Sequence, residues 1–267
     1  MQFDSLGDRM KFYEDQGRSW ERSPSGLPLL IRLDGRAFHT YTRGLPRPFC
    51  EPFNRALSGV AMALAKGTNA RAAYTQSDEI SLVLMANTHT EQIYFDGRRD
   101  KINSVLASEC TWLFSRYIKY ELSEDLLPTF PALFDCRCWT VPSDVEATNY
   151  FIWREEDAVR NSIQACGQAN FSHKELQGKS CRDIIRMLAE KDIDWHQLSA
   201  RQRRGVYIVR HYEPAEDGTL RRHYSYKDEW PYLKALENRV EALFNGEDPL
   251  VREGSITADG NGAEAAT

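Results

Sequence analysis

The stretch "TQSDEISLVL", residues 75–84, places polar and acidic residues between two runs that are typical of β-strands. Together with "RAAY" before it, it predicts two strands joined by a tight connection around Asp78. A second stretch, "LPLLIRLDGRAFH" (27–39), has the apolar content of a buried strand and ends in a turn at "DGR". Both stretches therefore put carboxylates at a strand end, with Asp34 in one and Asp78 and Glu79 in the other.

Helical periodicity alternates with these strands. Apolar residues recur at steps of three and four in "FCEPFNRALSGVAMALAKG" (49–67) and in "DKINSVLASECTWLFSRYIKYEL" (100–122), and "FPALFDCRCWTVP" (130–142) is typical of a further strand. The order β-α-β-β-α-β over about residues 28–142 predicts an α+β fold, with a ferredoxin-like antiparallel sheet and two helices on one face. Polymerase palm and nucleotidyl cyclase domains share this order. Its first strand and central hairpin are neighbours, so Asp34 can lie beside the acids of the hairpin.

The second half of the chain has a different organisation. The segment 143–172 predicts a long helix capped by Ser143, residues 180–193 predict a shorter helix, and residues 205–226 predict a hairpin. We therefore divide the chain into three parts, of which the last lacks periodicity and is expected to be mobile. These parts are a palm-like catalytic part (1–142), a helical fingers-like part with a hairpin (143–244) and a tail (245–267).

The composition is that of an ordinary soluble protein, with 42% hydrophobic and 27% charged residues among 267. No run approaches the roughly 18 apolar residues of a membrane span, and the N-terminal segment lacks a signal-peptide core, so we expect a cytoplasmic location. The six cysteines include no CxxC pair, which argues against a zinc site. The net charge of −5 gives no general attraction to nucleic acid. Basic patches at 97–101 and 201–223 could supply it locally, or could be solvated charged faces.

Carboxylates that lie close together repel one another, and a hard cation relieves that cost. Mg²⁺ prefers oxygen ligands, and two such ions about 3.5–4 Å apart can clamp an in-line phosphoryl displacement. The alternative for Asp34 is a turn residue, and for Asp78 and Glu79 the polar tip of a hairpin. Lys101 opens a predicted helix together with Arg98 and Arg99, which indicates either a triphosphate site or a solvated helix terminus.

Six motifs follow one another along the chain: "RLDGRAFH" (32–39), "TQSDE" (75–79), "RRDK" (98–101), "FDCR" (134–137), "YFIWREEDAVRNSI" (150–163) and "RRGVYIVR" (203–210). In this order they resemble the motifs of the tRNA-His guanylyltransferase family. The resemblance implies an enzyme that adds nucleotides to the 5′ end of tRNA in the 3′–5′ direction, on a palm-like fold with a helical fingers-like part. It also implies two Mg²⁺ ions, ATP or GTP, and a homotetramer.

The resemblance assigns roles to individual residues. It implies Asp34, Asp78 and Glu79 as catalytic residues, and Asp34, Asp78 and the carbonyl of Gly35 as metal ligands. The nucleotide-binding residues that it implies are Arg36, Ala37, Phe38, His39, Arg47, Ser77 and Lys101. The residues that it implies for contacts with the tRNA are Arg154, Asn161, Arg201, Arg203, Arg204 and Arg210.

One departure from the family's motifs narrows the range of reactions that we expect of this chain. Eukaryotic family members that add G to tRNA-His carry a His-Ile-Asn-Asn motif, whereas this chain has "VRNS" at 159–162 and keeps only Asn161. That pattern is similar to the bacterial and archaeal Thg1-like branch, which implies template-dependent repair of 5′-truncated tRNAs. The alternatives are single G addition to tRNA-His, a nucleotidyl cyclase-like enzyme, or a non-catalytic nucleotide- or RNA-binding module.

Overall fold

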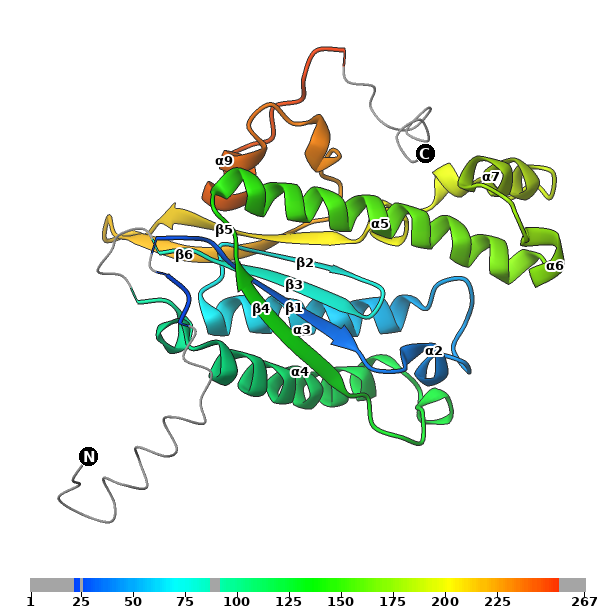
Figure 1. The fold of residues 1–267 in the computed structure, drawn as a ribbon, viewed down its shortest axis with the longest axis horizontal. Helices are drawn as coiled ribbons and strands as arrows, with labels where there is room; N and C mark the ends of the chain where they lie inside the picture. Colours follow the sequence, from blue (N-terminus) through cyan, green and yellow to red (C-terminus); the bar gives the residue numbers. More distant parts are fainter. Residues whose placement is uncertain (1–21, 25, 87–91, 255–267) are drawn as a thin grey trace, which may run out of the picture.

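The structure, a computed structural model, describes residues 22–24, 26–86 and 92–254. Its centre is a six-stranded antiparallel sheet in the order β4-β1-β3-β2-β5-β6 (Figure 1). The predicted α+β class with an antiparallel sheet is confirmed. The strands are β1 (Leu29–Gly35), β2 (Ala72–Gln76), β3 (Glu79–Leu84), β4 (Phe134–Thr140), β5 (Val206–Pro214) and β6 (Leu220–Lys227).

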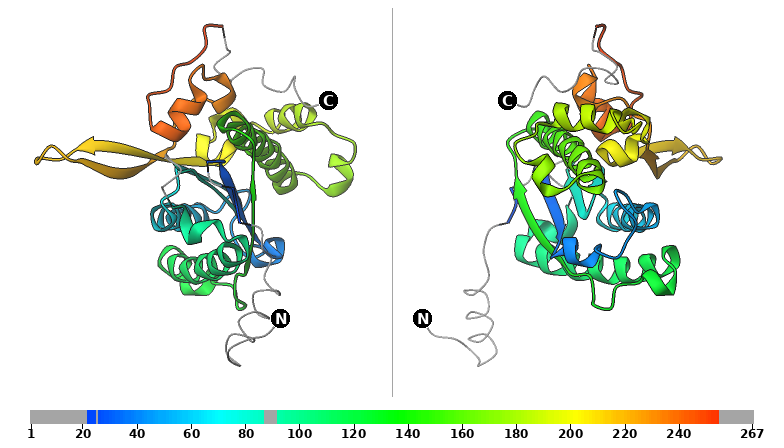
Figure 2. Two further views of the ribbon diagram at one scale, coloured as in Figure 1. Left: turned by 60° about the vertical axis from the view of Figure 1, so that its left-hand side comes forward. Right: turned by 90° about the vertical axis from the view of Figure 1, so that its right-hand side faces the viewer.

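Strand alternation divides the side chains between two cores. Leu29, Ile31 and Leu33 point into a core with α3 and α4, whereas Leu30 belongs to a second core that includes Phe151 of α5. Helices therefore cover both faces of the sheet (Figures 1 and 2). The helices are α2 (Phe38–Tyr41), α3 (Glu51–Thr68), α4 (Arg99–Glu121), α5 (Asp144–Asn170), α6 (His173–Leu176), α7 (Cys181–Ala189), α8 (Ala200–Arg204) and α9 (Arg239–Asn245). Short 3₁₀ turns are η1 (Tyr94–Gly97), η2 (Glu124–Leu126), η3 (Trp195–Gln197) and η4 (Leu233–Ala235).

Helix α5 is the longest helix of the described chain, and it lies along the sheet. Ser143 begins it by accepting a hydrogen bond from the backbone N–H of Glu146, as the sequence predicts. Its apolar face, which includes Ala147 and Phe151, packs on the sheet, and its C-terminal end reaches beyond the sheet to α6 and α7 (Figure 1). The helix therefore carries residues both over the sheet and to one end of it.

The second half of the chain joins the sheet that the first half begins. Strand β5 pairs with β2, so the hairpin predicted in the fingers-like part extends the same sheet. The end of this hairpin projects well beyond the body of the molecule (Figure 2). Buried residues of α5 and β5 pack in one core with residues of β1, β2 and β3, so this core is shared by the parts of the chain before and after residue 142.

Part of the predicted tail has regular contacts. Val251 forms a β-bridge with Leu236, and the backbone N–H of Leu250 donates to the side chain of Asn238. These bonds hold residues 248–252 against the segment after η4, which differs from the unstructured tail expected from residue 245. Residues 255–267 lie outside the described residues. The six cysteines are free thiols. Among the described helices, none has the length and apolarity that a bilayer crossing requires.

Candidate functional site

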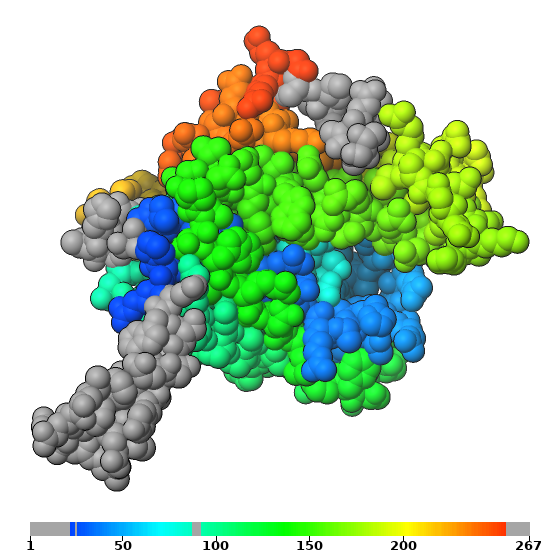
Figure 3. Space-filling model, in the orientation of Figure 1, coloured from blue at the N-terminus to red at the C-terminus, as the bar shows by residue number. Residues whose placement is uncertain are grey.

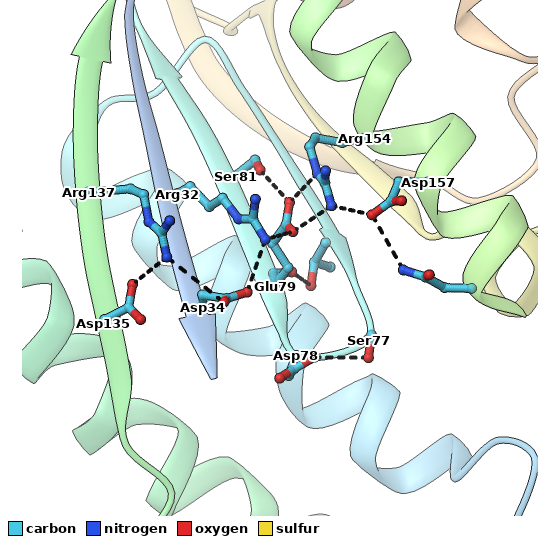
Figure 4. A network of polar contacts seen from close by, with 12 residues as sticks. Arg32, Asp34, Ser77, Asp78, Glu79, Ser81, Asp135, Arg137, Arg154 and Asp157 are labelled. Atoms are coloured by element: carbon cyan, nitrogen blue, oxygen red, sulfur yellow. Dashed lines mark hydrogen bonds and ion pairs between the residues drawn. The ribbon is translucent and has the colours of Figure 1, made fainter. Parts of the chain in front are cut away.

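Asp34 and Asp78, the two acids predicted to bind metal, lie at the same end of the sheet. Asp34 lies opposite Glu79 in the β1–β3 register, and the backbone N–H of Gly35 donates to the carbonyl of Asp78 at 3.1 Å. Ser77 has a left-handed backbone with φ 49°, which turns the chain between β2 and β3, and its hydroxyl donates to Asp78 Oδ1 at 3.0 Å. Asp34 and Asp78 are 44 residues apart in the chain, and strand pairing brings them to the same end of the sheet (Figure 4).

The charges of Asp34 and Asp78 interact at this end of the sheet. Burial raises the pKa of Asp78, and the nearby charge of Asp34 raises it further. In the described part of the chain, no group of three or more His, Cys, Asp or Glu side chains could hold a metal ion. The residues predicted to hold the metal lie at this end: the charges of Asp34 and Asp78 interact, and Gly35 lines a hollow together with Asp78. Such a set suits Mg²⁺, which takes few protein ligands and keeps water or phosphate oxygens in its shell.

Two arginines that the sequence analysis left without a role lie beside Asp34. Arg32 donates to Asp34 Oδ1 at 3.2 Å, and Arg137 of β4 approaches Oδ2 at 4.0 Å (Figure 4). The Nε of Arg32 is buried without a hydrogen-bond partner among the described residues. Strand alternation could have identified Arg32, because it stands two residues before Asp34 and so shares its face. Arg137 lies directly opposite Arg32 in the register.

Glu79 lies in the same cluster but is not open to solvent. Its side chain is 3% exposed, and Arg154 of α5 donates to both of its carboxylate oxygens, at 2.8 and 2.9 Å. Arg32 adds a third contact at 2.8 Å. Burial raises the pKa of Glu79, whereas the two arginines lower it. The geometry makes Glu79 an ion-pair partner rather than an open ligand.

Two adjoining hollows begin beside the acids. One, of about 390 Å³, is lined by Gly35, Ala37, Phe38, His39 and Ser77, together with Asp78. The other, of about 380 Å³, shares His39 and Ser77 with the first and reaches Arg47 on the loop before α3 and Asn161 and Arg201 on the opposite wall. In Figure 3 the surface is hollowed between the blue segment after β1 and the green helix α5 above it.

The backbone around the hollows is unusual. Ala37 and Ser77 both have positive φ, at 56° and 49°, although neither is glycine. Such strained residues concentrate at functional sites. A Cβ added to Gly35 would lie 2.3 Å from the ring of Phe38, so the glycine allows this close approach.

Most of the predicted nucleotide-binding residues gather here, but Lys101 does not. Ala37, Phe38, His39, Arg47 and Ser77 line the hollows, and Arg36 follows the metal-ligand candidate Gly35 with its side chain exposed.

Lys101 lies at the far end of the sheet from Asp34 and lines neither hollow, so its role in nucleotide binding stays a prediction. Arg99, at the start of α4, donates to Thr140, and Thr140 pairs with Leu29, at the opposite end of β1 from Asp34. Lys101 instead places its ammonium 4.4 Å from the centroid of the Phe95 ring.

Three of the arginines predicted to contact RNA are buried, and the structure corrects those predictions. Arg154 pairs with Glu79, Arg204 pairs with Glu155 at 2.7 Å, and Arg210 donates to the carbonyl of Asn69 at 3.2 Å and to its side chain at 2.7 Å. Each guanidinium is committed to a partner inside the fold, so none presents its charge to a polyanion.

The remaining predicted RNA contacts are partly or fully exposed. Asn161 is exposed, and Arg201 and Arg203 are half-buried. Arg201 pairs with Asp228 at 2.6 Å. Asn161 and Arg201 line the larger hollow, so they remain candidates for contact with a ligand there.

Comparison with known proteins is consistent with this geometry. The sequence model of the tRNAHis guanylyltransferase family matches residues 7–142, which is about half of the chain and includes both acids. The chain belongs to this family. It is therefore a nucleotidyltransferase.

Solved structures of family members match over most of the chain. A bacterial tRNA(His) guanylyltransferase (Thg1)-like protein in complex with ATP is 35% identical, with a TM-score of 0.78, and covers 90% of this chain and 99% of its own. A second such structure, in complex with GTP, is 34% identical, with a TM-score of 0.68, and covers 86% of this chain and 94% of its own. A probable tRNA(His) guanylyltransferase from Dictyostelium discoideum is 27% identical over 196 residues, which are 68% of this chain and 75% of that protein.

Proposed function

We propose that this nucleotidyltransferase adds nucleotides to the 5′ end of tRNA in the 3′–5′ direction, directed by the opposite strand, and so repairs 5′-truncated tRNAs. The observation that carries the proposal is the meeting of Asp34 and Asp78 at one sheet end, beside hollows large enough for a nucleotide. The family of this chain, together with its relatives solved in complex with ATP and with GTP, supports nucleoside triphosphates as substrates. The departure from the His-Ile-Asn-Asn motif at 159–162 favours repair over single G addition.

The proposed site uses two Mg²⁺ ions on a palm-like sheet. The antiparallel order β4-β1-β3-β2, with α3 and α4 on one face, supports the palm-like topology. Asp34, Asp78 and the carbonyl of Gly35 would hold the metal. Bound Mg²⁺ lowers the cost of forming the attacking oxyanion and stabilises the departing phosphate.

The protein's own residues orient the reacting groups. Arg47, His39 and Ser77 line the path from the larger hollow to Asp78, so they would hold the triphosphate of the incoming nucleotide. Arg32 and Arg137 would balance the charge of a second phosphate group near Asp34, such as a 5′ end activated by ATP or GTP. Asn161, Arg201 and Arg203 would contact the acceptor end of the tRNA. A homotetramer in the cytoplasm is part of the same proposal.

Incubation with tRNA and single nucleoside triphosphates tests the proposed reaction. Repair predicts that a 5′-truncated tRNA is extended by the nucleotide complementary to the opposite base, and that changing this base changes the nucleotide added, as read from product length on a gel. G addition to full-length tRNA-His whatever the opposite base would favour the guanylyltransferase alternative. Turnover of triphosphate with no extension of any tRNA would contradict both.

Replacing Arg47 with alanine should raise the KM for the incoming triphosphate about tenfold or more, because it removes a charge-assisted contact to phosphate. The substitution should change KM but not the melting temperature, since Arg47 is exposed. Arg43→Ala is the matched control, as Arg43 is an exposed arginine on the same loop that lines neither hollow. Equal effects of both changes would mean that only the general charge of the loop matters.

A further inference from the structure

A buried arginine joins the two halves of the candidate site. Arg154 of α5 is 4% exposed, and its guanidinium donates to both carboxylate oxygens of Glu79 on β3. Burial alone would lower the pKa of Arg154, but the carboxylate of Glu79 outweighs this and raises it. The pair is therefore a fixed, bidentate bridge between the helix and the sheet.

On the sheet side, the bridge continues to the first acid. The second oxygen of Glu79 accepts from Arg32 at 2.8 Å, and Arg32 reaches Asp34 at 3.2 Å. Ser81 also donates to Glu79 at 3.2 Å and lies 2.8 Å from the hydroxyl of Tyr150 on α5. Glu79 is thus held from three sides, and it shares Arg32 with Asp34 (Figure 4).

On the helix side, the bridge continues to the wall of the larger hollow. Arg154 donates to Asp157 Oδ2 at 2.7 Å, and Asp157 accepts from Arg160 at 2.6 Å. Asn161, which lines the hollow, donates to Asp157 Oδ2 at 3.4 Å, the oxygen that also accepts from Arg154. One unbroken series of polar contacts therefore runs from Asp34 on β1 to Asn161 on α5.

We propose that Arg154 is a positioning residue that couples the metal-binding end of the sheet to the wall of the larger hollow on α5. Through Glu79 and Arg32 it sets the position of Asp34, and through Asp157 it sets that of Asn161. Glu79 accordingly acts by holding arginines and not by binding metal. The inference rests on the proposed function for its activity readout only, because metal and nucleotide binding can be measured without turnover.

The same helix offers a matched control. The neighbouring residue Glu155 forms a similarly buried ion pair with Arg204 and also accepts from the backbone N–H of Leu233, and neither contact belongs to the series that links Asp34 to Asn161. A variant of Arg204 therefore disturbs a buried pair on α5 without touching the series of contacts between the acids and the hollow. Loss of stability alone can be separated in this way from loss of positioning.

The test compares Arg154→Lys, Arg154→Met and Arg204→Lys with the wild type. Binding of Mn²⁺ in the presence of ATP is followed by electron paramagnetic resonance, the melting temperature by calorimetry, and nucleotide addition as a function of Mg²⁺ concentration. Lysine keeps the charge at position 154 but cannot bind Glu79 bidentately and reach Asp157 as well. We expect both Arg154 variants to weaken Mn²⁺–ATP binding at least fivefold, to raise the half-saturating Mg²⁺ concentration similarly and to lower kcat at least tenfold.

Arg204→Lys should lower the melting temperature and leave Mn²⁺–ATP binding within twofold of the wild type. Arg154 variants that bind Mn²⁺–ATP as the wild type does, and lose activity only in step with melting temperature, would overturn the proposal. So would an equal binding loss in Arg204→Lys. If the wild type fails to extend any tRNA but the Arg154 variants still weaken Mn²⁺–ATP binding, the proposed function falls while the positioning role stands.

Discussion

Replacing Asp78 with asparagine is expected to lower the rate of nucleotide addition by about 10³-fold or more. The amide keeps the size of the side chain but removes one of the two carboxylates that meet at the β1–β3 end. A bound Mg²⁺ contributes several kcal/mol of transition-state stabilisation, and each 1.36 kcal/mol corresponds to a factor of ten. Single-turnover extension of a 5′-truncated tRNA at saturating Mg²⁺ measures the change.

The same substitution should stabilise the metal-free protein at neutral pH. Burial and the charge of Asp34 raise the pKa of Asp78, so the fold binds its proton more tightly than the unfolded chain does. The stability from this group is present at low pH and is lost as the pH rises through the folded pKa. Asp78→Asn should therefore raise the melting temperature by about 1–3 °C at pH 7.5 in EDTA, and the gain should vanish below about pH 4.

Mg²⁺ should reverse the order of stability, because it binds the folded wild type and not the variant. Asp135→Asn is the matched control, since Asp135 is an exposed aspartate opposite Asp34 on β4 whose contact is with Arg137. Activity of Asp78→Asn within tenfold of the wild type would contradict the metal assignment. A variant that melts well below the wild type would show that the carboxylate serves the fold.

The sheet end was predictable because its signals are local. The acidic tip of the β2–β3 hairpin and the strand-ending "DGR" stand beside apolar runs of strand length, and antiparallel neighbours bring such ends together. Two local patterns thus placed Asp34 and Asp78 side by side before any packing was known. The long helices followed in the same way from their apolar spacing.

The remote position of Lys101 follows from strand direction, which the sequence analysis did not use. Strand β3 begins at Glu79 beside Asp34 and ends at Leu84 beside Leu29. The helix that follows this strand, α4, starts near that second end, as the contact of Arg99 with Thr140 shows. Helix α4 begins with basic residues, as the sequence predicts. It begins at the end of the sheet opposite Asp34, because β3, the strand before it, runs away from the acids.

The buried arginines could not be found by local reasoning. Arginine is mostly exposed, and an arginine-rich segment such as "ARQRRGVYIVR" (200–210) resembles a nucleic-acid patch unless the partners are known. Those partners are distant in the chain: Arg154 and Glu79 are 75 residues apart, and Arg204 and Glu155 are 49 residues apart. Only the packing of α5 on the sheet and on α8 brings them together.

Removing the guanidinium of Arg204 should therefore destabilise the fold and not act chiefly on RNA binding. Glu155 is 1% exposed, and Arg204 Nη1 donates to it at 2.7 Å while Nη2 donates to the carbonyl of Trp230. Arg204→Ala removes the arginine from this buried carboxylate, which keeps the N–H of Leu233, at 2.9 Å, as a hydrogen-bond donor. Loss of one member of a buried pair costs about 3–5 kcal/mol, or roughly a 10 °C fall in melting temperature.

Two comparisons separate this structural role from an RNA contact. Arg186→Ala removes the exposed partner of Asp183 on α7 and should leave the melting temperature nearly unchanged, because exposed ion pairs contribute little to stability. The double variant Arg204→Met/Glu155→Leu should recover much of the stability, since apolar residues of similar size can replace a buried pair. At a temperature where Arg204→Ala stays folded, its affinity for tRNA should remain within threefold of the wild type. An unchanged melting temperature with a tenfold loss of tRNA affinity would instead make Arg204 a direct RNA contact, because only an arginine that opens toward solvent could produce that combination.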